Sequence, residues 1–512
     1  MRRLLKIAGF IFTLILIGFV IRIVYLQEKT DKIEIIFTND IHGHIFSELE
    51  DTGKSRGGFP ALSTFLKKVK NPYILLDAGD IFQGTPEGNF SKGKVVIDAM
   101  NYLGYDACTM GNHEIDFGMD VFKKLVERSR FPFLCANFIE EKTGSVPDFL
   151  KPYVILKVGK YKIGVIGIIT SLLPEIVIKE NIKGYTVIDE IEVLKKYINE
   201  LKDEVDILII LSHVGISRDK KYLDDVEIAK NVKGIDFIIG GHTHQFLEFP
   251  LKVNDTYIFQ AGCFLKSVGR IVLRIHKEKK KIIDLKYKLI PLYLDYFPED
   301  KNLFDLLKSS LGDIYTGFNV KIGESKRWLY RFLRGKQKKN GELPLGNLIT
   351  DVMRKYAKTD FAFQNIGGIR ADLPKGDIKL RHIYMLHPFG NTIYTMKLTG
   401  KKVRKLLEQS VSGKFGILQV SGLKLIWDSY LPEGRRVLNV IVNGKEIEED
   451  KEYTVATNSF LAQGGDGFTV FLEGKDVKDT GVLLRDVMIE YIKDNSSIDA
   501  KVEGRIVNVS IE

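Results

Sequence analysis

The sequence contains little cysteine: only Cys108, Cys135 and Cys263 occur in 512 residues. A small, odd number of cysteines excludes a disulfide framework, and without a Cys-x-x-Cys pair no thiolate zinc site is expected. Each cysteine lies in an apolar segment that is typical of a strand or a strand end. We therefore predict three buried, free thiols.

The sequence also lacks any RRM-like, zinc-finger or helix-turn-helix motif. The formal net charge of +10 therefore does not indicate recognition of a nucleic acid polymer. The positive charge fits a lysine-rich solvated surface. It fits equally an electrostatic field that attracts phosphorylated substrates or an anionic membrane. The composition is that of a globular protein, and a chain of 512 residues is expected to form two or three domains.

A long hydrophobic run lies at the N-terminus. Three basic residues among the first six precede an apolar run over residues 7–21, which resumes after Arg22. About 20 apolar residues span a bilayer, and the basic residues hold the N-terminal end in the cytoplasm. Residues 20–29 offer no small-residue cleavage site. We predict an uncleaved signal-anchor over residues 1–28 rather than a cleaved signal, and in either case an exported, extracytoplasmic protein.

After this segment, short apolar runs alternate with amphipathic stretches. Residues 163–169 and 207–211 are typical of buried strands, whereas 94–103 and 193–201 have helical periodicity. This alternation predicts an α/β fold in layers. Polar residues recur just past the strand ends, where open α/β sheets build their ligand sites.

Histidine is concentrated in these strand-end motifs. Six of the nine histidines lie in Asn-Asp-Ile-His-Gly-His (39–44), Gly-Asn-His-Glu-Ile-Asp (111–116), Ser-His-Val-Gly (212–215) and Gly-Gly-His-Thr-His (240–244). Asp40 and His42 are expected to point the same way, because side chains alternate along an extended segment. Imidazole, carboxylate and amide ligands without sulfur suit Mn²⁺, Zn²⁺ or Fe.

Two metal ions in one site need a carboxylate that bridges them. Asp80 is the natural candidate, because it follows a glycine at the end of a buried strand in Asp-Ala-Gly-Asp (77–80). Two ions about 3.5–4 Å apart clamp a phosphoryl group and activate water. His113 and Asp116 form a candidate catalytic pair, in which the carboxylate orients an imidazole that stabilises the phosphoryl group or protonates the leaving oxygen.

The order of these motifs resembles that of the calcineurin-like metallophosphatases. The strings Leu-Leu-Asp-Ala-Gly-Asp (75–80), Gln-Gly-Thr (83–85) and Gly-Asn-His-Glu-Ile-Asp (111–116) resemble the 5′-nucleotidase branch, and the resemblance covers nearly all of residues 33–507. It implies a four-layer α/β/β/α metallophosphatase sandwich, a linker helix and a smaller α/β substrate-binding domain. We place these parts at residues 29–290, 291–319 and 320–512.

The resemblance also implies a role for each polar residue of the first domain. Two divalent ions (Zn, Mn or similar) are expected, with His113 and Asp116 as the catalytic pair. The implied ligands are Asp40, His42, Asp80 and His244 for one ion, and Asp80, Asn112, His213 and His242 for the other.

The second domain carries further motifs of the same family, at 365–370, 388–391, 458–460 and 464–468. The resemblance implies that Phe389 and Phe460 sandwich the base, and that Arg370 binds phosphate or ribose-side groups. One position departs from the family, because a lysine stands where an arginine is usual before Leu-Gly-Asn-Leu, and Arg334 is a nearby substitute. The predicted substrate-binding residues are Asn365, Gly368, Arg370, Phe389, Phe460, Asp466 and Lys339.

The sequence thus predicts an extracytoplasmic 5′-nucleotidase that hydrolyses nucleoside 5′-monophosphates, with nucleotide sugars and di- or triphosphates as further candidates. A 2′,3′-cyclic-nucleotide 2′-phosphodiesterase/3′-nucleotidase is the alternative enzyme. A nucleotide-binding surface protein without turnover is the alternative of another class, although no metal ligand or catalytic residue of the family is missing. The predicted linker is expected to act as a hinge between the domains.

Overall fold

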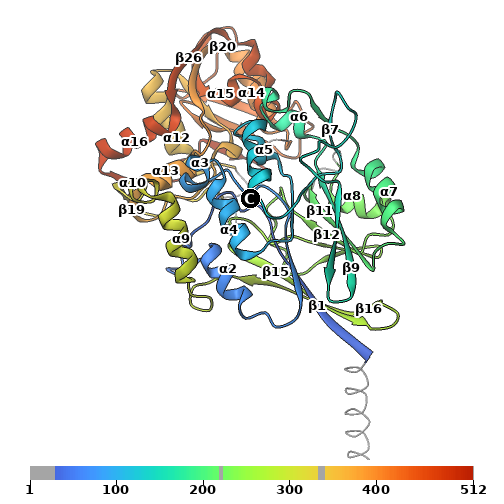
Figure 1. Ribbon diagram of the computed structural model, residues 1–512. Helices are drawn as coiled ribbons and strands as arrows, with labels where there is room; N and C mark the ends of the chain where they lie inside the picture. The colour runs from blue at the N-terminus through green and yellow to red at the C-terminus, as the bar shows by residue number, and fades with distance from the viewer. Residues whose placement is uncertain (1–28, 218–222, 333–340, 415, 511–512) are drawn as a thin grey trace, which may run out of the picture.

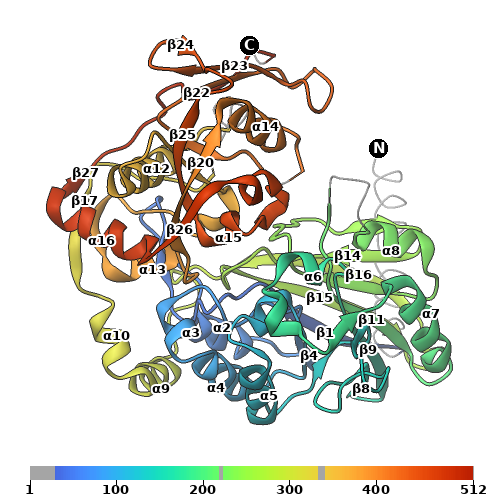
Figure 2. The same cartoon turned by 90° about the horizontal axis from the view of Figure 1, so that it is seen from above.

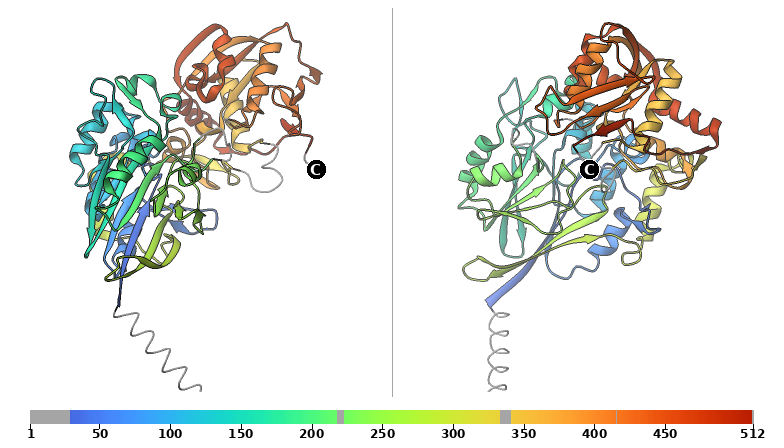
Figure 3. Two further views of the ribbon diagram at one scale, coloured as in Figure 1. Left: turned by 90° about the vertical axis from the view of Figure 1, so that its right-hand side faces the viewer. Right: turned by 180° about the vertical axis from the view of Figure 1, so that it is seen from behind.

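The computed structural model describes residues 29–217, 223–332, 341–414 and 416–510. Two α/β parts lie side by side, one drawn in blue to green and the other in orange to red (Figures 1 and 3). No helix within these ranges is long and apolar enough to cross a membrane. The predicted signal-anchor over residues 1–28 lies outside the described residues.

The first part contains two six-stranded sheets. In spatial order, the first sheet consists of β16 (Ile282–Pro291), β15 (Ser267–His276), β1 (Thr30–Thr38), β4 (Tyr73–Asp77), β5 (Ala107–Thr109) and β6 (Phe133–Leu134). The second consists of β13 (Leu251–Val253), β14 (Thr256–Phe259), β12 (Phe237–Gly240), β11 (Ile207–His213), β9 (Tyr161–Ile169) and β8 (Tyr153–Val158).

The two sheets pack face to face because their strands are apolar on both sides. Along β1, Ile35 and Phe37 enter the core between the sheets, whereas Ile36 faces the helices on the outer side. The first sheet is covered by α2 (Phe59–Leu66), α4 (Lys94–Leu103) and α5 (Met119–Arg128), and the second by α7 (Glu190–Leu201) and α8 (Asp225–Asn231). The predicted four-layer α/β/β/α sandwich is confirmed.

Two helices connect the parts and are drawn in yellow in Figure 2. They are α9 (Lys301–Leu311) and α10 (Asp313–Gly317), and both lie within the predicted linker. The four-residue spacing of Leu303, Leu307 and Leu311 puts these side chains on one face of α9, where they are buried against the first part. The boundaries at 290 and 320 stay predictions.

The second part is built on a five-stranded sheet of β21 (Gln419–Ser421), β18 (Phe361–Gln364), β25 (Glu452–Asn458), β20 (Thr392–Thr399) and β26 (Lys475–Leu483). Along β18, Ala362 faces the core with α12 (Pro344–Ala357) and α16 (Leu484–Asn495). Phe361 and Phe363 face the opposite core with α14 (Gly400–Ser410). This sheet with helices on both faces confirms the predicted α/β class of the second part.

One glycine is required where β1 pairs with β15. Gly269 lies opposite Phe37, and a Cβ at position 269 would overlap the Phe37 ring. We predict that Gly269→Ala lowers the free energy of unfolding by about 1–3 kcal/mol, because the buried ring has no room to move. Denaturant unfolding would measure the loss. Gly317→Ala is the matched control, since a Cβ there meets nothing within 4 Å, and equal stability of the two variants would refute the packing argument.

Candidate active site

The predicted metal ligands follow strands that run parallel within each sheet. β1 pairs in parallel with β4 and β4 with β5, while β11 pairs in parallel with β9 and β12. Their carboxyl ends therefore meet at one edge of the sandwich. Three groups of side chains there have potential ligand atoms within 4.8 Å of one another: Asp40, His42 and His244; His42, Asp80 and His113; and Asp80, His213 and His242.

The first group has the geometry of a cation site. Nε2 of His42 lies 3.1 Å from Nε2 of His244, which in turn lies 3.4 Å from Oδ1 of Asp40. Nδ1 of His42 is 2.8 Å from the carbonyl oxygen of Gln83, so Nδ1 carries the proton and Nε2 presents a lone pair. Imidazole lone pairs beside a buried carboxylate fit a divalent cation.

The group of Asp80, His213 and His242 repeats this arrangement. Nδ1 of His213 is 2.7 Å from the carbonyl oxygen of Ala78, which turns Nε2 towards Oδ2 of Asp80 at 3.0 Å. The same Asp80 oxygen is 3.8 Å from Nε2 of His42. His242 Nδ1 and Asn112 Oδ1 lie 2.9 Å apart beside this group. The Asp80 carboxylate thus lies between the two groups, as a bridging ligand requires.

The backbone at these side chains is strained. Asp40, His42, Asp80, His242 and His244 all have positive φ, at 51°, 49°, 58°, 70° and 55°. Such conformations cost about 1–3 kcal/mol each for residues other than glycine, and they persist where the surroundings enforce them. The expectation that Asp40 and His42 lie on an extended segment is therefore wrong. Asp40 and His42 are brought together by left-handed turns after β1 and not by strand alternation.

Glu114 and Asn39 position these loops, a role that the sequence did not predict for either residue. The buried Glu114 carboxylate accepts hydrogen bonds from the backbone N–H groups of Asp80, Ile81 and Gly111, at 2.9, 2.8 and 2.5 Å. The amide of Asn39 donates to Asp40 Oδ2 at 2.7 Å. The only signal for either residue was its place inside a motif that already contained candidate ligands.

The two residues of the predicted catalytic pair are in contact. Asp116 Oδ2 lies 2.7 Å from Nδ1 of His113, and the backbone N–H of His113 donates to Oδ1 of Asp80 at 2.8 Å. Burial disfavours the charged imidazole, but the carboxylates of Asp116 and Asp80 outweigh it and raise the pKa of His113. His113 is thereby oriented beside the candidate metal groups.

The second part of the chain contributes side chains to the same place. The ring centroid of Phe389 lies 6.0 Å from that of His113, and Cζ of Arg370 lies 5.9 Å from the Phe389 centroid. Asn365 donates to Asp466 at 2.8 Å. The predicted substrate-binding residues Arg370 and Phe389 therefore lie against the predicted catalytic pair. Lys339 and the predicted substitute Arg334 lie outside the described residues.

Two glycines in the predicted substrate-binding motifs leave no space for a side chain. A Cβ at Gly368 would lie within 3.0 Å of the Asn365 side chain, and one at Gly465 would lie 2.5 Å from the ring of Phe460. The glycines of the two substrate motifs thus let the asparagine and the phenylalanine take their positions. Phe460 and Phe389 are both half-buried.

One further sequence-based expectation concerns the three cysteines. Cys108 and Cys135 are buried and free as predicted. Cys263 is only half-buried and lies in the loop beside His244.

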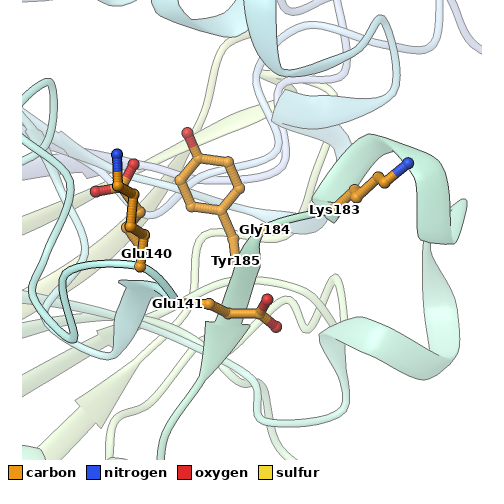
Figure 4. Close-up of a pocket in the computed structure, with 6 residues that line it drawn as sticks. Glu140, Glu141, Lys183, Gly184 and Tyr185 are labelled. Carbon is orange, nitrogen blue, oxygen red and sulfur yellow. The ribbon is translucent and has the colours of Figure 1, made fainter.

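A separate surface pocket, drawn in Figure 4, is lined by residues 140–142 and 183–185. It contains none of the predicted site residues.

Comparisons with known proteins agree with this geometry. Residues 33–246 match the calcineurin-like phosphoesterase family, and residues 321–473 match the 5′-nucleotidase C-terminal domain. The chain is 30% identical to an apyrase of Tabanus yao, over 93% of each protein. It is 32% identical to the trifunctional nucleotide phosphoesterase protein YfkN of Bacillus subtilis, but spans only 35% of that relative.

A solved structure extends the similarity to the whole fold. The 5′-nucleotidase precursor from Thermus thermophilus superposes with a TM-score of 0.83 at 30% identity, covering 93% of this chain and 99% of that one. Fold and site together define a metal-dependent phosphoester hydrolase of the calcineurin-like class. The chain belongs to the 5′-nucleotidase family.

Proposed function

We propose that the protein hydrolyses nucleoside 5′-monophosphates with the aid of two divalent metal ions. The observation that carries this proposal is the position of the Asp80 carboxylate, 3.0 Å from Nε2 of His213 in one group and 3.8 Å from Nε2 of His42 in the other. Asp40, His42, Asp80 and His244 would hold one ion, and Asp80, Asn112, His213 and His242 the other. Two ions so held supply charge neutralisation at the phosphoryl group and activation of water.

The remaining side chains act directly on the substrate. Asp116 fixes His113 through Nδ1, which leaves Nε2 to stabilise the phosphoryl oxygens or to protonate the leaving oxygen. The Arg370 guanidinium binds phosphate, and Phe389 and Phe460 hold the base. Stacking on aromatic rings contributes about 1–3 kcal/mol per base and is tolerant of base identity. The second part thus holds the base of the nucleotide, and the first part cleaves its phosphate ester, which releases the nucleoside and phosphate.

The test is phosphate release from AMP by residues 29–512, stripped of metal and then reloaded with Mn²⁺ or Zn²⁺. Release that requires the metal supports the reaction class. AMP, 3′-AMP and 2′,3′-cyclic AMP are then compared at equal concentration. A preference for the cyclic ester would replace the 5′-nucleotidase proposal by the 2′,3′-cyclic-nucleotide 2′-phosphodiesterase/3′-nucleotidase alternative.

That alternative is kept because one relative is named a trifunctional nucleotide phosphoesterase, so the family includes proteins with more than one activity on nucleotides. Nucleotide sugars and di- or triphosphates belong to the same substrate panel. A protein that bound AMP, contained no divalent ion and released no phosphate from any of these substrates would be the non-catalytic binding protein.

We further propose that the two parts move relative to each other during turnover. Three of the contacts that now join them involve α3: Asn89 donates to the carbonyl of Pro388 at 3.1 Å, Glu87 pairs with Arg381 at 3.2 Å, and the rings of Phe90 and Tyr384 lie 5.7 Å apart. These residues lie on α3 (Pro86–Phe90) of the first part and in or next to α13 (Leu380–Leu386) of the second. A turnover cycle that opens the site must break such contacts.

Crosslinking measures this motion. Cysteines introduced at Phe90 and Tyr384, joined by a reducible crosslinker, should slow turnover by at least about 10-fold if domain opening limits substrate exchange. Reduction should restore the rate, and each single-cysteine variant treated in the same way is the control. Full turnover in the crosslinked protein would count against the hinge.

The proposed location is outside the cytoplasm, held at the membrane by residues 1–28. The apolar run and its basic flank support this proposal. We expect the full chain to remain in the membrane fraction in high salt and to be released by detergent, whereas a variant without residues 1–28 stays soluble. Release of the full chain by salt alone would exclude a span.

A further inference from the structure

One end of the first part of the molecule is rich in lysine. It consists of the start of β1 (residues 29–32), the turn between β8 and β9 with its flanks (157–162), and the turn between β15 and β16 (277–281). Figure 1 shows the start of β1 and the β15–β16 hairpin together at the lower end of the first part, away from the second part. We call these three segments the basic pole.

The three segments of the basic pole are in contact with one another. The backbone N–H of Lys277 donates to the carbonyl of Lys29 at 2.9 Å, and the hydroxyl of Tyr161 donates to the Asp31 carboxylate at 2.9 Å. The same carboxylate lies 3.2 Å from Nζ of Lys160 and 3.8 Å from Nζ of Lys277. The pole is therefore one continuous surface centred on Asp31.

The basic pole has an excess of positive charge. Its 15 residues include nine lysines, against two acidic residues, Asp31 and Glu278. Two carboxylates beside the pole, those of Glu204 and Asp206, each pair with one of its lysines, at 3.9 and 3.0 Å. An excess of five positive charges remains. This small surface thus holds half of the formal net charge of +10.

The pole also presents side chains that are available to a partner. Lys157, Lys279 and Lys281 are exposed, and they form no ion pair with any residue that the structure describes. Ile283, two residues after Lys281, is an exposed apolar side chain with 47% of its surface accessible. Ammonium groups beside an apolar side chain fit the headgroup region of an anionic bilayer.

The sequence places this pole next to the apolar N-terminal run. The run ends at Leu26, and only Gln27 and Glu28 separate it from Lys29. Three residues of chain reach at most about 10 Å. Electrostatic attraction also acts over about 10 Å at about 0.1 M salt. A bilayer that holds residues 1–28 therefore lies within reach of the charges of the pole.

We propose that the basic pole docks on a surface of anionic phospholipids and that the docked protein holds its active site away from the membrane. This proposal rests on the proposed membrane location and deepens it. A strand rises about 3.3 Å per residue, so the nine residues of β1 place the site at its carboxyl end about 30 Å from the pole. The nucleotide site then faces the medium and not the lipid.

The experiment is hydrogen exchange of the full chain in lipid nanodiscs. Discs of phosphatidylcholine, which is zwitterionic, are compared with discs that also contain phosphatidylglycerol, which is anionic. Each lysine near an anionic surface strengthens docking about fivefold, so the backbone amides of Gly159 and Lys160 should exchange at least about fivefold more slowly in the anionic discs. Salt at about 1 M should abolish this slowing, because the screening length falls to about 3 Å.

Charge reversal at the other turn tests whether the pole is responsible. Lys279→Glu combined with Lys281→Glu should abolish the slowing at Gly159 and Lys160, whose own sequence is unchanged. Lys401→Glu combined with Lys424→Glu is the matched control, because both lysines are exposed on the second part and the change in net charge is the same. The control variant should keep the slowing.

Three results would decide against the docking. They are equal exchange in the two kinds of disc, loss of the slowing in the control variant, and slower exchange with soluble polyphosphate but not with anionic discs. The last of these would assign the pole to an anionic polymer. A chain whose pole is protected by anionic discs, but which leaves the discs in high salt, would refute the proposed anchor and leave the docking intact.

Discussion

Replacing His113 with alanine should lower kcat for AMP by about 10²- to 10⁴-fold, the usual contribution of a positioned acid or base. Nδ1 of His113 is engaged by Asp116 at 2.7 Å, and its ring lies 5.2 Å from that of His42. The imidazole is therefore oriented next to the proposed phosphoryl position, where alanine leaves a gap. Steady-state kinetics with AMP, together with metal analysis of the variant, measures the effect.

The metal content of His113→Ala should equal that of the unmodified protein, because His113 is not a proposed ligand. Asp116→Asn should lower kcat less than His113→Ala does. The double variant should have the same kcat as His113→Ala, since Asp116 acts through the imidazole. His276→Ala, at the end of β15 and outside the site, is the matched control. Turnover of His113→Ala within twofold of the control would remove His113 from the mechanism.

Asp80→Asn should lower kcat for AMP at least about 1,000-fold, because a metal pair stabilises the charge of the transition state by several kcal/mol. The substitution keeps the shape of the side chain but removes the negative charge that lies between His42 and His213. Oδ1 of Asp80 also accepts the backbone N–H of His113. We expect metal analysis to show fewer than two ions per chain in this variant, together with the loss of phosphate release from AMP.

Asp77→Asn is the matched control for this experiment. Asp77 is the last residue of β4, three residues before Asp80, and its carboxyl group accepts hydrogen bonds from Thr38 and from the N–H of Gly79. Burial raises the pKa of Asp77 well above its usual range, so a neutral amide is a close substitute. Asp77→Asn should bind metal normally. Full metal content in Asp80→Asn would exclude Asp80 as the bridge.

Much of the fold follows from local patterns. The apolar run at 163–169 lies in β9, and the helical periodicity at 94–103 corresponds to α4. The motif positions after strand ends were also sufficient to expect one shared site, because parallel strands end at the same edge. The left-handed turns at Asp40 and His42 were not predicted. Aspartate and histidine take positive φ more often than most residues, but only a small fraction of them do, so the residue types alone do not mark the turns.

The sequence by itself determined the layered α/β architecture and the kinds of side chain in the site, since periodicity and strand-end motifs are local properties of the chain. Only the tertiary structure decided that Phe389 lies 6.0 Å from His113 and that Arg331 is fixed to the carbonyl of Arg370. These neighbours come from distant segments, and for Phe389 from different parts of the molecule. Their meeting depends on how whole sheets and helices pack, and no short sequence pattern encodes that packing.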